Sequence, residues 1–206
     1  MSEIDSIVFD VGRVLFDFDH EISFAFLEKH GASFDRESFF RDVFLDQYER
    51  GELTTDEFIA RLEALFPKPV VREALLEHWQ DIFTPIPEML ELLDGLKDQY
   101  RVFLLSNTCH LHWSFLDSEY DIESIAHGCL TSFGAGLRKP DPDIFLEAER
   151  RFALTPARSV FIDDIEENVR TAAARGWKTV HHVSPSATRD ALRKLGVMAK
   201  ESSPKL

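Results

Sequence analysis

The chain alternates short runs of β-branched and aromatic residues with amphipathic helical patterns. Runs typical of buried strands span 4–9, 100–105, 159–162 and 178–183. Helical patterns lie between these runs, at 87–99, 142–152 and 166–175. Because strands alternate with helices, the sequence predicts an α/β fold. Its core would be a doubly wound, Rossmann-like parallel sheet with binding sites beyond the carboxyl ends of the strands.

A long segment after the first predicted strand departs from this alternation. It shows helical periodicity without a strong strand pattern, and its candidate helices span 22–29, 36–47, 55–65 and 71–83. Thr54 or Thr55 would cap the third of these helices. The segment is too long for an ordinary crossover connection. We therefore expect a core formed by 1–17 and 85–200, an inserted helical domain at 18–84 and a flexible tail at 201–206.

Phenylalanine is abundant, with 18 copies, and it clusters in and near the helical segment. The clusters are Phe16 with Phe18, Phe24 with Phe26, and Phe39 and Phe40 with Phe44. Several of these residues fall at helical spacing, which favours an aromatic core for a small helical unit. A substrate-binding wall is the alternative interpretation.

Composition and charge argue against several classes of protein. The 206 residues are 44% apolar and 29% charged, which is typical of a folded soluble chain. With 37 acids and 23 bases the net charge is −14, which argues against a nucleic-acid partner. An anionic substrate would then need local cations, either a metal or a few lysines and arginines. The sequence contains no apolar run long enough for a membrane span, so we expect no membrane partner.

The first residues and the cysteines bear on where the protein works. Residues 1–5 are acidic and lack the basic-then-apolar order of an export signal. Cys109 and Cys129 cannot form a disulfide framework, and we expect both to be small buried hydrophobes. The prediction is a cytoplasmic protein with reduced thiols.

Polar groups follow three of the predicted strands and would meet at one edge of the sheet. They are Asp10, Ser106 with Asn107, and Asp163 with Asp164, and a glycine-rich loop brings Lys139. Carboxylates about 4 Å apart repel by on the order of 4 kcal/mol at an effective dielectric of 20, and a divalent cation relieves this repulsion. Oxygen ligands select a hard ion such as Mg²⁺. The alternative for Asp163 and Asp164 is that they merely cap the next helix.

Four motifs in this order resemble those of the haloacid dehalogenase-like (HAD) hydrolase superfamily. They are Phe-Asp-Val-Gly-Arg-Val-Leu at 9–15, Leu-Leu-Ser-Asn-Thr at 104–108, Arg-Lys-Pro at 138–140, and Phe-Ile-Asp-Asp at 161–164 followed by Asn168. Together with the helical insertion they cover nearly the whole chain. The insertion after the first strand is similar to the small helical cap of the C1 type.

The resemblance implies a role for each polar residue of the motifs. Asp10 would attack phosphorus and form an aspartyl-phosphate, which is covalent catalysis by a carboxylate. Ser106 and the backbone N–H of Asn107 would hold phosphoryl oxygens. Lys139 would neutralise the nucleophile and the phosphate together.

The resemblance also implies a metal site. Mg²⁺ would be bound by Asp10, Asp164 and the backbone carbonyl of Gly12, and Asp163 would support this shell. Gly12 is a departure, because most phosphatases of the superfamily carry a second aspartate there, which protonates the leaving oxygen and then activates water. One branch with Asp-x-Gly-Asn-Val in this motif includes α-D-glucose-1-phosphate phosphatase-like proteins. The present chain resembles that branch there and at 48–53, although Arg13 replaces the branch's asparagine.

Three explanations of Gly12 remain open. Another acid could substitute, and Asp17 and Asp19 are the nearest candidates, although both also suit a solvated hinge. A substrate with a good leaving group, such as the anomeric oxygen of a sugar 1-phosphate, would need less protonation. Catalysis could instead be lost, leaving a protein that only binds phosphorylated ligands. We favour the second explanation.

The function predicted from the sequence is a Mg²⁺-dependent phosphatase for small phosphorylated metabolites, with sugar phosphates favoured. Arg50 would contact a sugar hydroxyl or a phosphate oxygen, unless it belongs to a surface charge cluster. The histidines lack ligand spacing and receive no metal role. The alternatives are a carbon–halogen hydrolase, since such enzymes also lack the second aspartate, and a non-catalytic protein on the same fold. The protein would be a monomer or a homodimer.

Overall fold

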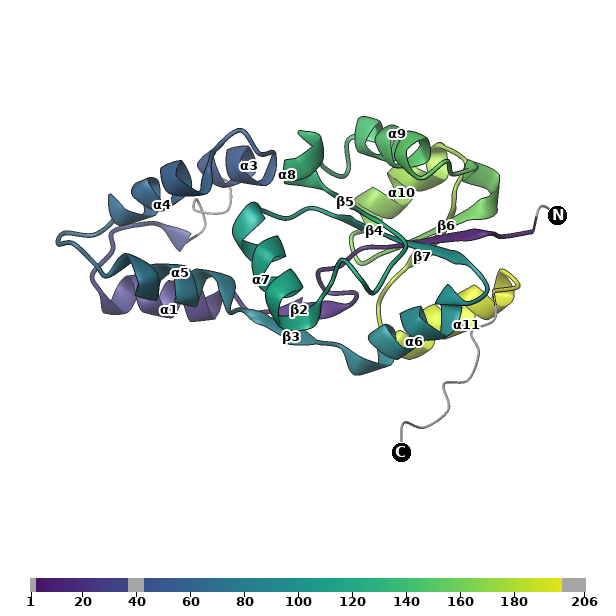
Figure 1. Cartoon of the computed structure of the whole chain (residues 1–206), viewed down its shortest axis with the longest axis horizontal. Helices are drawn as coiled ribbons and strands as arrows, with labels where there is room; N and C mark the ends of the chain where they lie inside the picture. The colour runs from purple at the N-terminus through teal and green to yellow at the C-terminus, as the bar shows by residue number, and fades with distance from the viewer. Residues whose placement is uncertain (1–2, 37–42, 198–206) are drawn as a thin grey trace.

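A five-stranded sheet forms the centre of the molecule (Figure 1). The computed structural model describes residues 3–36 and 43–197. In spatial order the strands are β5 (Cys129–Thr131), β4 (Arg101–Ser106), β1 (Ser6–Phe9), β6 (Ser159–Asp163) and β7 (Lys178–His181). All neighbouring strands pair in parallel, so the predicted α/β fold with a doubly wound parallel sheet is confirmed.

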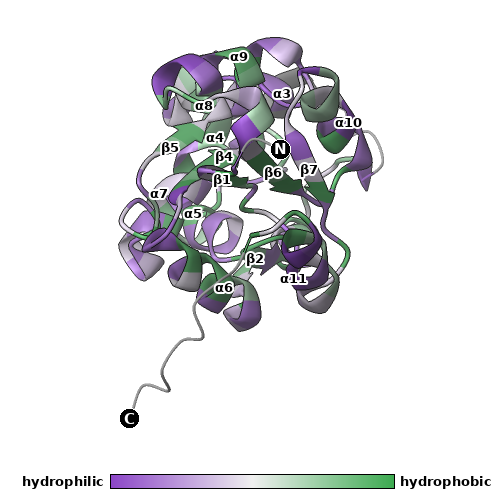
Figure 2. Ribbon diagram, turned by 90° about the vertical axis from the view of Figure 1, so that its right-hand side faces the viewer, coloured by the Kyte–Doolittle hydropathy of each residue, from purple (hydrophilic) through white to green (hydrophobic). Residues whose placement is uncertain are grey.

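Helices cover both faces of this sheet, as Figure 1 shows. One face is covered by α6 (Pro87–Lys97) and α11 (Pro185–Lys194), and the other by α9 (Pro142–Arg151) and α10 (Glu166–Ala174). Successive side chains of a strand point to opposite faces. Ile7 and Phe9 therefore join the buried cluster beside α6 and α11, and Val8 joins the one beside α9 and α10. Hydrophobic residues accordingly gather along the central strands in Figure 2, while polar residues lie on the outer helices.

The helical segment, residues 18–84, forms most of a third buried cluster, which Cys109 of the core also joins. Its helices are α1 (Glu21–Lys29), α3 (Val43–Glu49), α4 (Thr55–Glu63) and α5 (Arg72–Gln80). Helix α4 begins with a capping box, in which Thr54 and Glu57 each accept a hydrogen bond from the other's backbone N–H. Thr54, and not Thr55, is therefore the cap.

Phe24 and Phe26 are buried in the cluster of the helical segment, as expected for an aromatic core. Phe16 instead belongs to the cluster of the sheet, and Phe18 lines a cavity described below. The expectations for Phe39, Phe40 and the tail at 201–206 lie outside the described residues, as does much of the predicted helix at 36–47. The side chain of Phe44 also lies outside the part of the chain that the structure describes.

Two short strands join the helical segment to the core. β2 (Phe16–Phe18) pairs antiparallel with β3 (Phe83–Pro85) and forms a separate two-stranded sheet. Three residues are too few for an alternating pattern, which is why the sequence did not predict these strands. The two-stranded sheet places both ends of the helical segment beside the core.

The helical segment also contacts the core through backbone atoms. The short helix α8 (Ser132–Ala135) follows β5, and α3 packs against it. Gly51 has φ +70°, and a Cβ atom at this residue would lie 2.3 Å from the carbonyl oxygen of Phe133. Glycine is required here both for the backbone conformation and for the close approach.

Both cysteines are free thiols, with Cys109 buried and Cys129 half-buried. Within 3–36 and 43–197, none of the helices combines the length and the apolar character that crossing a bilayer requires.

Candidate active site

Three neighbouring strands end at the same edge of the sheet, and each delivers a polar side chain there. Asp10 directly follows β1, Ser106 ends β4 and Asp163 ends β6. Because β1 pairs with both β4 and β6, these strand ends are adjacent. The structure thus brings together the polar groups that the sequence places after separate strands.

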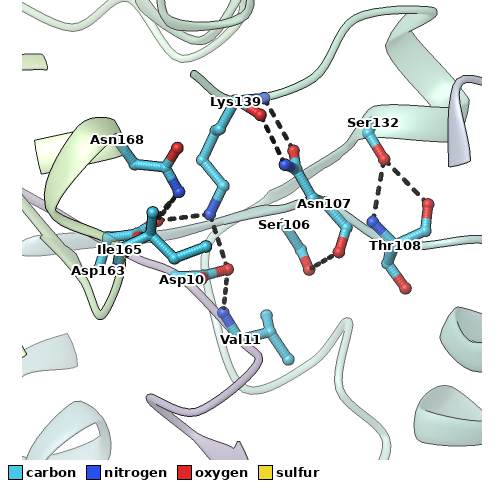
Figure 3. A network of polar contacts seen from close by, with 10 residues as sticks. All are labelled: Asp10, Val11, Ser106, Asn107, Thr108, Ser132, Lys139, Asp163, Ile165 and Asn168. Atoms are coloured by element: carbon cyan, nitrogen blue, oxygen red, sulfur yellow. Dashed lines mark hydrogen bonds and ion pairs between the residues drawn. The ribbon is translucent and has the colours of Figure 1, made fainter. Parts of the chain in front are cut away.

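Lys139 lies between two of these carboxylates (Figure 3). Its Nζ is 2.8 Å from Oδ1 of Asp10 and 2.7 Å from Oδ2 of Asp163. The lysine is only 2% exposed, although it comes from the loop between α8 and α9. A buried ammonium is stable only when it is paired, and the two carboxylates provide that pairing.

Asn107 fixes the backbone of this lysine. The side-chain amide of Asn107 donates to the carbonyl oxygen of Lys139 at 2.8 Å and accepts from its backbone N–H at 2.8 Å. The following residue, Thr108, is held in turn, because its backbone N–H donates to the hydroxyl of Ser132. The end of β4 and the loop of Lys139 therefore support each other in one hydrogen-bonded network (Figure 3).

Asp163 is held by the start of the next helix. The Nδ2 of Asn168 donates to both carboxylate oxygens, at 3.0 and 3.1 Å, and the backbone N–H of Ile165 donates to Oδ1 at 2.8 Å. Ile165 is the N-cap residue of α10 and provides no side-chain cap. Asp163 thus satisfies one backbone donor near the helix start, as the capping alternative requires, but it also pairs with Lys139. Asn168, for which the sequence predicted no role beyond its place after the motif at 161–164, orients this carboxylate.

The charges of this cluster influence one another. Burial raises the pKa of Asp10 to about 7, in spite of the opposite effect of Lys139 and with a further increase from Asp163. Burial opposes the charge of Lys139, but Asp10 and Asp163 outweigh that effect and raise its pKa. The pKa of Asp164 is raised by burial and by Asp163. Crowded carboxylates with raised pKa values indicate a place where additional positive charge is favourable.

Asp10, Asp163 and Asp164 form a possible metal site. Each offers a carboxylate oxygen, and these atoms all lie within 4.8 Å of one another. An all-oxygen donor set of this kind suits a hard cation such as Mg²⁺. Participation of the Gly12 carbonyl remains a prediction. We refer to Asp10, Lys139, Asp163 and Asp164 as the strand-end cluster.

Phe18 restricts the space beside Gly12. A Cβ atom added at residue 12 would lie 3.0 Å from Cε1 of the Phe18 ring, which is tighter than an ordinary contact. The guanidinium of Arg13 lies over the same Phe18 ring, 4.4 Å from its centre, and pairs with Asp17. A side chain at residue 12 would therefore require the ring to move. The contact with Phe18 is a structural reason for a glycine at residue 12, and the sequence alone did not reveal it.

Asp17 and Asp19, the two candidates to replace the missing acid at residue 12, have other contacts. Asp17 is exposed and pairs with Arg13, and Asp19 accepts a hydrogen bond from the backbone N–H of Glu21 at the start of α1. Neither acid lines the cavity next to Ser106 and Asn107. Their position gives no support to a role as proton donor.

Arg50 belongs to a group of ion pairs between the helical segment and the core. Its Nε is 2.9 Å from Asp46, and Arg138 pairs with the same carboxylate. Arg138 also lies 3.1 Å from Glu49. Arg50 does not line the cavity next to Ser106 and Asn107, and its ion pair is with Asp46 and not with a member of the strand-end cluster. Arg138, the residue before Lys139, connects the core to α3 through these ion pairs.

A cavity of about 110 Å³ opens next to Ser106 and Asn107. Its polar lining includes Glu49 and two histidines, His20 and His112, and its other walls are mostly aromatic and aliphatic. Glu49 and His20 come from the helical segment, and His112 comes from α7 (His110–Tyr120). The sequence did not predict the two histidines as site residues, because only the folded chain places them near the strand ends.

The fold and the strand-end cluster correspond to a known class of hydrolases. A model of the haloacid dehalogenase-like hydrolase family matches residues 4–176, which is most of the chain. The chain therefore belongs to this family and is a hydrolase of the HAD type.

Particular relatives are phosphatases. The chain is similar to a D-ribitol-5-phosphate phosphatase from Bacteroides thetaiotaomicron, with 27% identity over 85% of this chain and 90% of the relative. It is also similar to the sesquiterpene phosphatase astK from Aspergillus oryzae, with 26% identity over 91% and 94% of the two chains. A crystal structure of a HAD family enzyme from Bacteroides thetaiotaomicron, in complex with magnesium and inorganic phosphate, matches with a TM-score of 0.80. Its identity is 28% over 86% of this chain and 93% of that one.

Proposed function

We propose that the protein is a Mg²⁺-dependent phosphatase that hydrolyses small phosphorylated metabolites through an aspartyl-phosphate on Asp10. The observation that supports this proposal most is the position of Lys139 between Asp10 and Asp163 at the strand ends. A lysine ammonium has three N–H donors. Two of them face these carboxylates, and the third would face a phosphoryl oxygen.

The contacts of Asp10 distinguish its two carboxylate oxygens. Both the Lys139 ammonium and the backbone N–H of Val11 contact Oδ1. Oδ2 would therefore form the bond to phosphorus while the bond to the leaving oxygen breaks. Ser106 and the backbone N–H of Asn107 would hold the phosphoryl oxygens during this step, and water would then release inorganic phosphate from Asp10.

The proposed Mg²⁺ agrees with the charge of the strand-end cluster. Three carboxylates and one ammonium have formal charges of −3 and +1, so the cluster has a charge of −2 when all are ionised. One divalent cation held by Asp10 and Asp164, with the Gly12 carbonyl, would balance it. When bound, the ion would stabilise negative charge on the phosphoryl oxygens.

We also propose that residues 18–84 act as a cap of the C1 type and that the substrate has a good leaving group, with sugar 1-phosphates favoured. Phe18 packs where an acid at residue 12 would need space, and Asp17 and Asp19 have other contacts. A leaving oxygen that needs little protonation suits such a site. The donor set of the strand-end cluster supports a phosphatase more than a metal-independent dehalogenase.

A panel of phosphorylated metabolites, including glucose 1-phosphate and glucose 6-phosphate, tests the proposal. Phosphate release should require Mg²⁺, stop with a chelator and favour the 1-phosphate. Asp10→Asn should reduce turnover by at least about 10³-fold, as expected for loss of a nucleophile. Asp164→Ala should raise the Mg²⁺ concentration needed for half-maximal activity at least tenfold, in line with loss of a metal ligand. Full activity of Asp10→Asn, or activity without divalent metal, would contradict the mechanism.

A further inference from the structure

The cavity next to Ser106 and Asn107 is placed to receive the part of a substrate that leaves with the bridging oxygen. Those two residues and Gly12 line it from the core, and Glu49 and Trp79 of the helical segment line it as well. A phosphoryl group held at the strand ends would direct its alcohol portion into this space. The cavity is therefore the place where the alcohol is selected, provided that the proposed phosphatase function is correct.

The cavity has no positive charge among the residues that the structure describes. No lysine or arginine is in its lining. The surrounding cations are each paired with acids: Lys139 with Asp10 and Asp163, Arg138 with Asp46 and Glu49, and Arg13 with Asp17.

The two histidines do not change this balance. Burial lowers the pKa of both His20 and His112 to about 4, so both are neutral near pH 7. His112 Nε2 lies 3.0 Å from the carbonyl oxygen of Trp79. Since a carbonyl can only accept, Nε2 is the protonated nitrogen, and Nδ1 of the neutral ring remains an acceptor. The histidines thus provide neutral hydrogen-bonding groups.

Glu49 makes the cavity unfavourable for an anion. It is the acid in the lining, and its carboxylate lies 3.1 Å from Arg138, which also pairs with Asp46, while Asp46 pairs with Arg50 as well. Burial raises the pKa of Glu49, and the charge of Arg138 opposes that rise. A second carboxylate or phosphate on the substrate would meet Glu49 without a free cation to compensate for it. Like charges in a partly desolvated space repel strongly.

The remaining walls suit a compact, partly apolar group. Phe18, Trp79, Ile82, Phe83 and Leu116 line the cavity. Its volume of about 110 Å³ is comparable with that of an engineered cavity of about 150 Å³ that binds benzene. The space is therefore on the scale of one six-membered ring.

We infer that this cavity selects phosphate monoesters of compact, uncharged alcohols and discriminates against esters with a second anionic group, with Glu49 as the specificity-determining residue. The inference rests on the proposed phosphatase function and adds the substrate class. Glu49 would act on the alcohol portion and not on the reacting phosphoryl group.

A matched pair of competitors tests the inference. Phenyl phosphate serves as the reporter substrate, since its alcohol is one uncharged ring. Glycerol 3-phosphate and 3-phosphoglycerate share a carbon skeleton and differ in that a hydroxymethyl group is replaced by a carboxylate. Their inhibition constants against phenyl phosphate hydrolysis, measured with Mg²⁺, should differ at least tenfold in favour of glycerol 3-phosphate. Equal constants, or tighter binding of 3-phosphoglycerate, would overturn the inference and leave the phosphatase proposal intact.

Two variants assign the effect to Glu49. Glu49→Gln keeps the shape of the side chain and should bring the two inhibition constants at least fivefold closer, mainly through tighter binding of 3-phosphoglycerate. Glu77→Gln removes the same charge from an exposed residue of α5 that does not line the cavity, and it should leave the ratio unchanged. An unchanged ratio in Glu49→Gln would refute the role of Glu49. If that variant does not fold, the wild-type ratio still decides the selectivity. Failure to hydrolyse phenyl phosphate and every ester of the panel would overturn the phosphatase proposal, and the inference with it.

Discussion

The strand-end cluster and the cavity beside it are neighbours, but they are built in opposite ways. In the cluster, carboxyl groups and an ammonium from separate parts of the core contact one another directly, and Asn107 and Asn168 fix the groups around them. The cavity is lined by residues that follow β1 and β4, such as Gly12 and Asn107, and by rings and aliphatic side chains of the helical segment and α7, with few charged groups. Under the proposed function, chemistry and selectivity would occupy different parts of the chain. Changes in the helical segment would then alter the substrate while leaving the reacting groups in place.

The largest effect is expected from removing the cation of the strand-end cluster. Lys139→Met would leave Asp10 and Asp163 buried without their partner, so the free energy of unfolding should fall by about 3–5 kcal/mol. Urea unfolding without divalent metal measures this loss, and added Mg²⁺ should restore part of it. Lys178→Met, at an exposed position in β7, is the control and should change stability by less than about 0.5 kcal/mol. A stable Lys139→Met protein would show that the carboxylates do not depend on the lysine.

An acid at residue 12 tests how the strand-end cluster and the cavity depend on the space beside Gly12. Gly12→Asp would force Phe18 to move and should cost about 1–3 kcal/mol of stability, as overpacking does. In the double variant Gly12→Asp/Phe18→Leu the smaller side chain should relieve this cost. If the missing proton donor limits the reaction, kcat/KM for an alkyl phosphate should then rise at least about tenfold relative to phenyl phosphate. No change in that ratio would exclude protonation of the leaving group as the limiting feature.

The smallest effect is expected for the pH dependence of stability, through His112 in the lining of the cavity. The pKa of His112 falls from 6.5 to about 4, chiefly through burial, so between these values the unfolded chain binds more protons than the folded one. The contribution is fully present above about pH 6.5 and is lost as the pH falls towards 4. His112→Gln retains a donor for the Trp79 carbonyl but does not titrate. Between pH 7.5 and 5 the wild type should lose about 1–2 kcal/mol more stability than this variant. Equal losses in urea unfolding would contradict the assignment.

The strand-end cluster was predictable because its information is local. Each strand is a short apolar run that ends in a polar residue, and parallel strands end at one edge of a sheet. The cavity was not predictable in this way. Phe18, His20 and His112 follow no common spacing, and they line one cavity in a structure where β2 and β3 are paired.

Arg50 illustrates a different limit of sequence reasoning. We expected it either to contact the substrate or to belong to a surface charge cluster, and in the structure its guanidinium pairs with Asp46. A contact with substrate stays a prediction. The two residues are four positions apart on a helical stretch, a spacing at which opposite charges commonly pair. That spacing favoured the alternative of a charge cluster. Arg138 completes this cluster from a loop far away in the sequence, and no local pattern could have indicated it.

The contact between Gly51 and the Phe133 carbonyl has a consequence for the junction between the helical segment and the core. Any side chain at that corner would act as a wedge between α8 and the loop after α3. Alanine there should push α8 and this loop apart, and the positive φ of residue 51 would add a backbone cost to that displacement. A single methyl group would thus weaken the junction between the helical segment and the core in two ways.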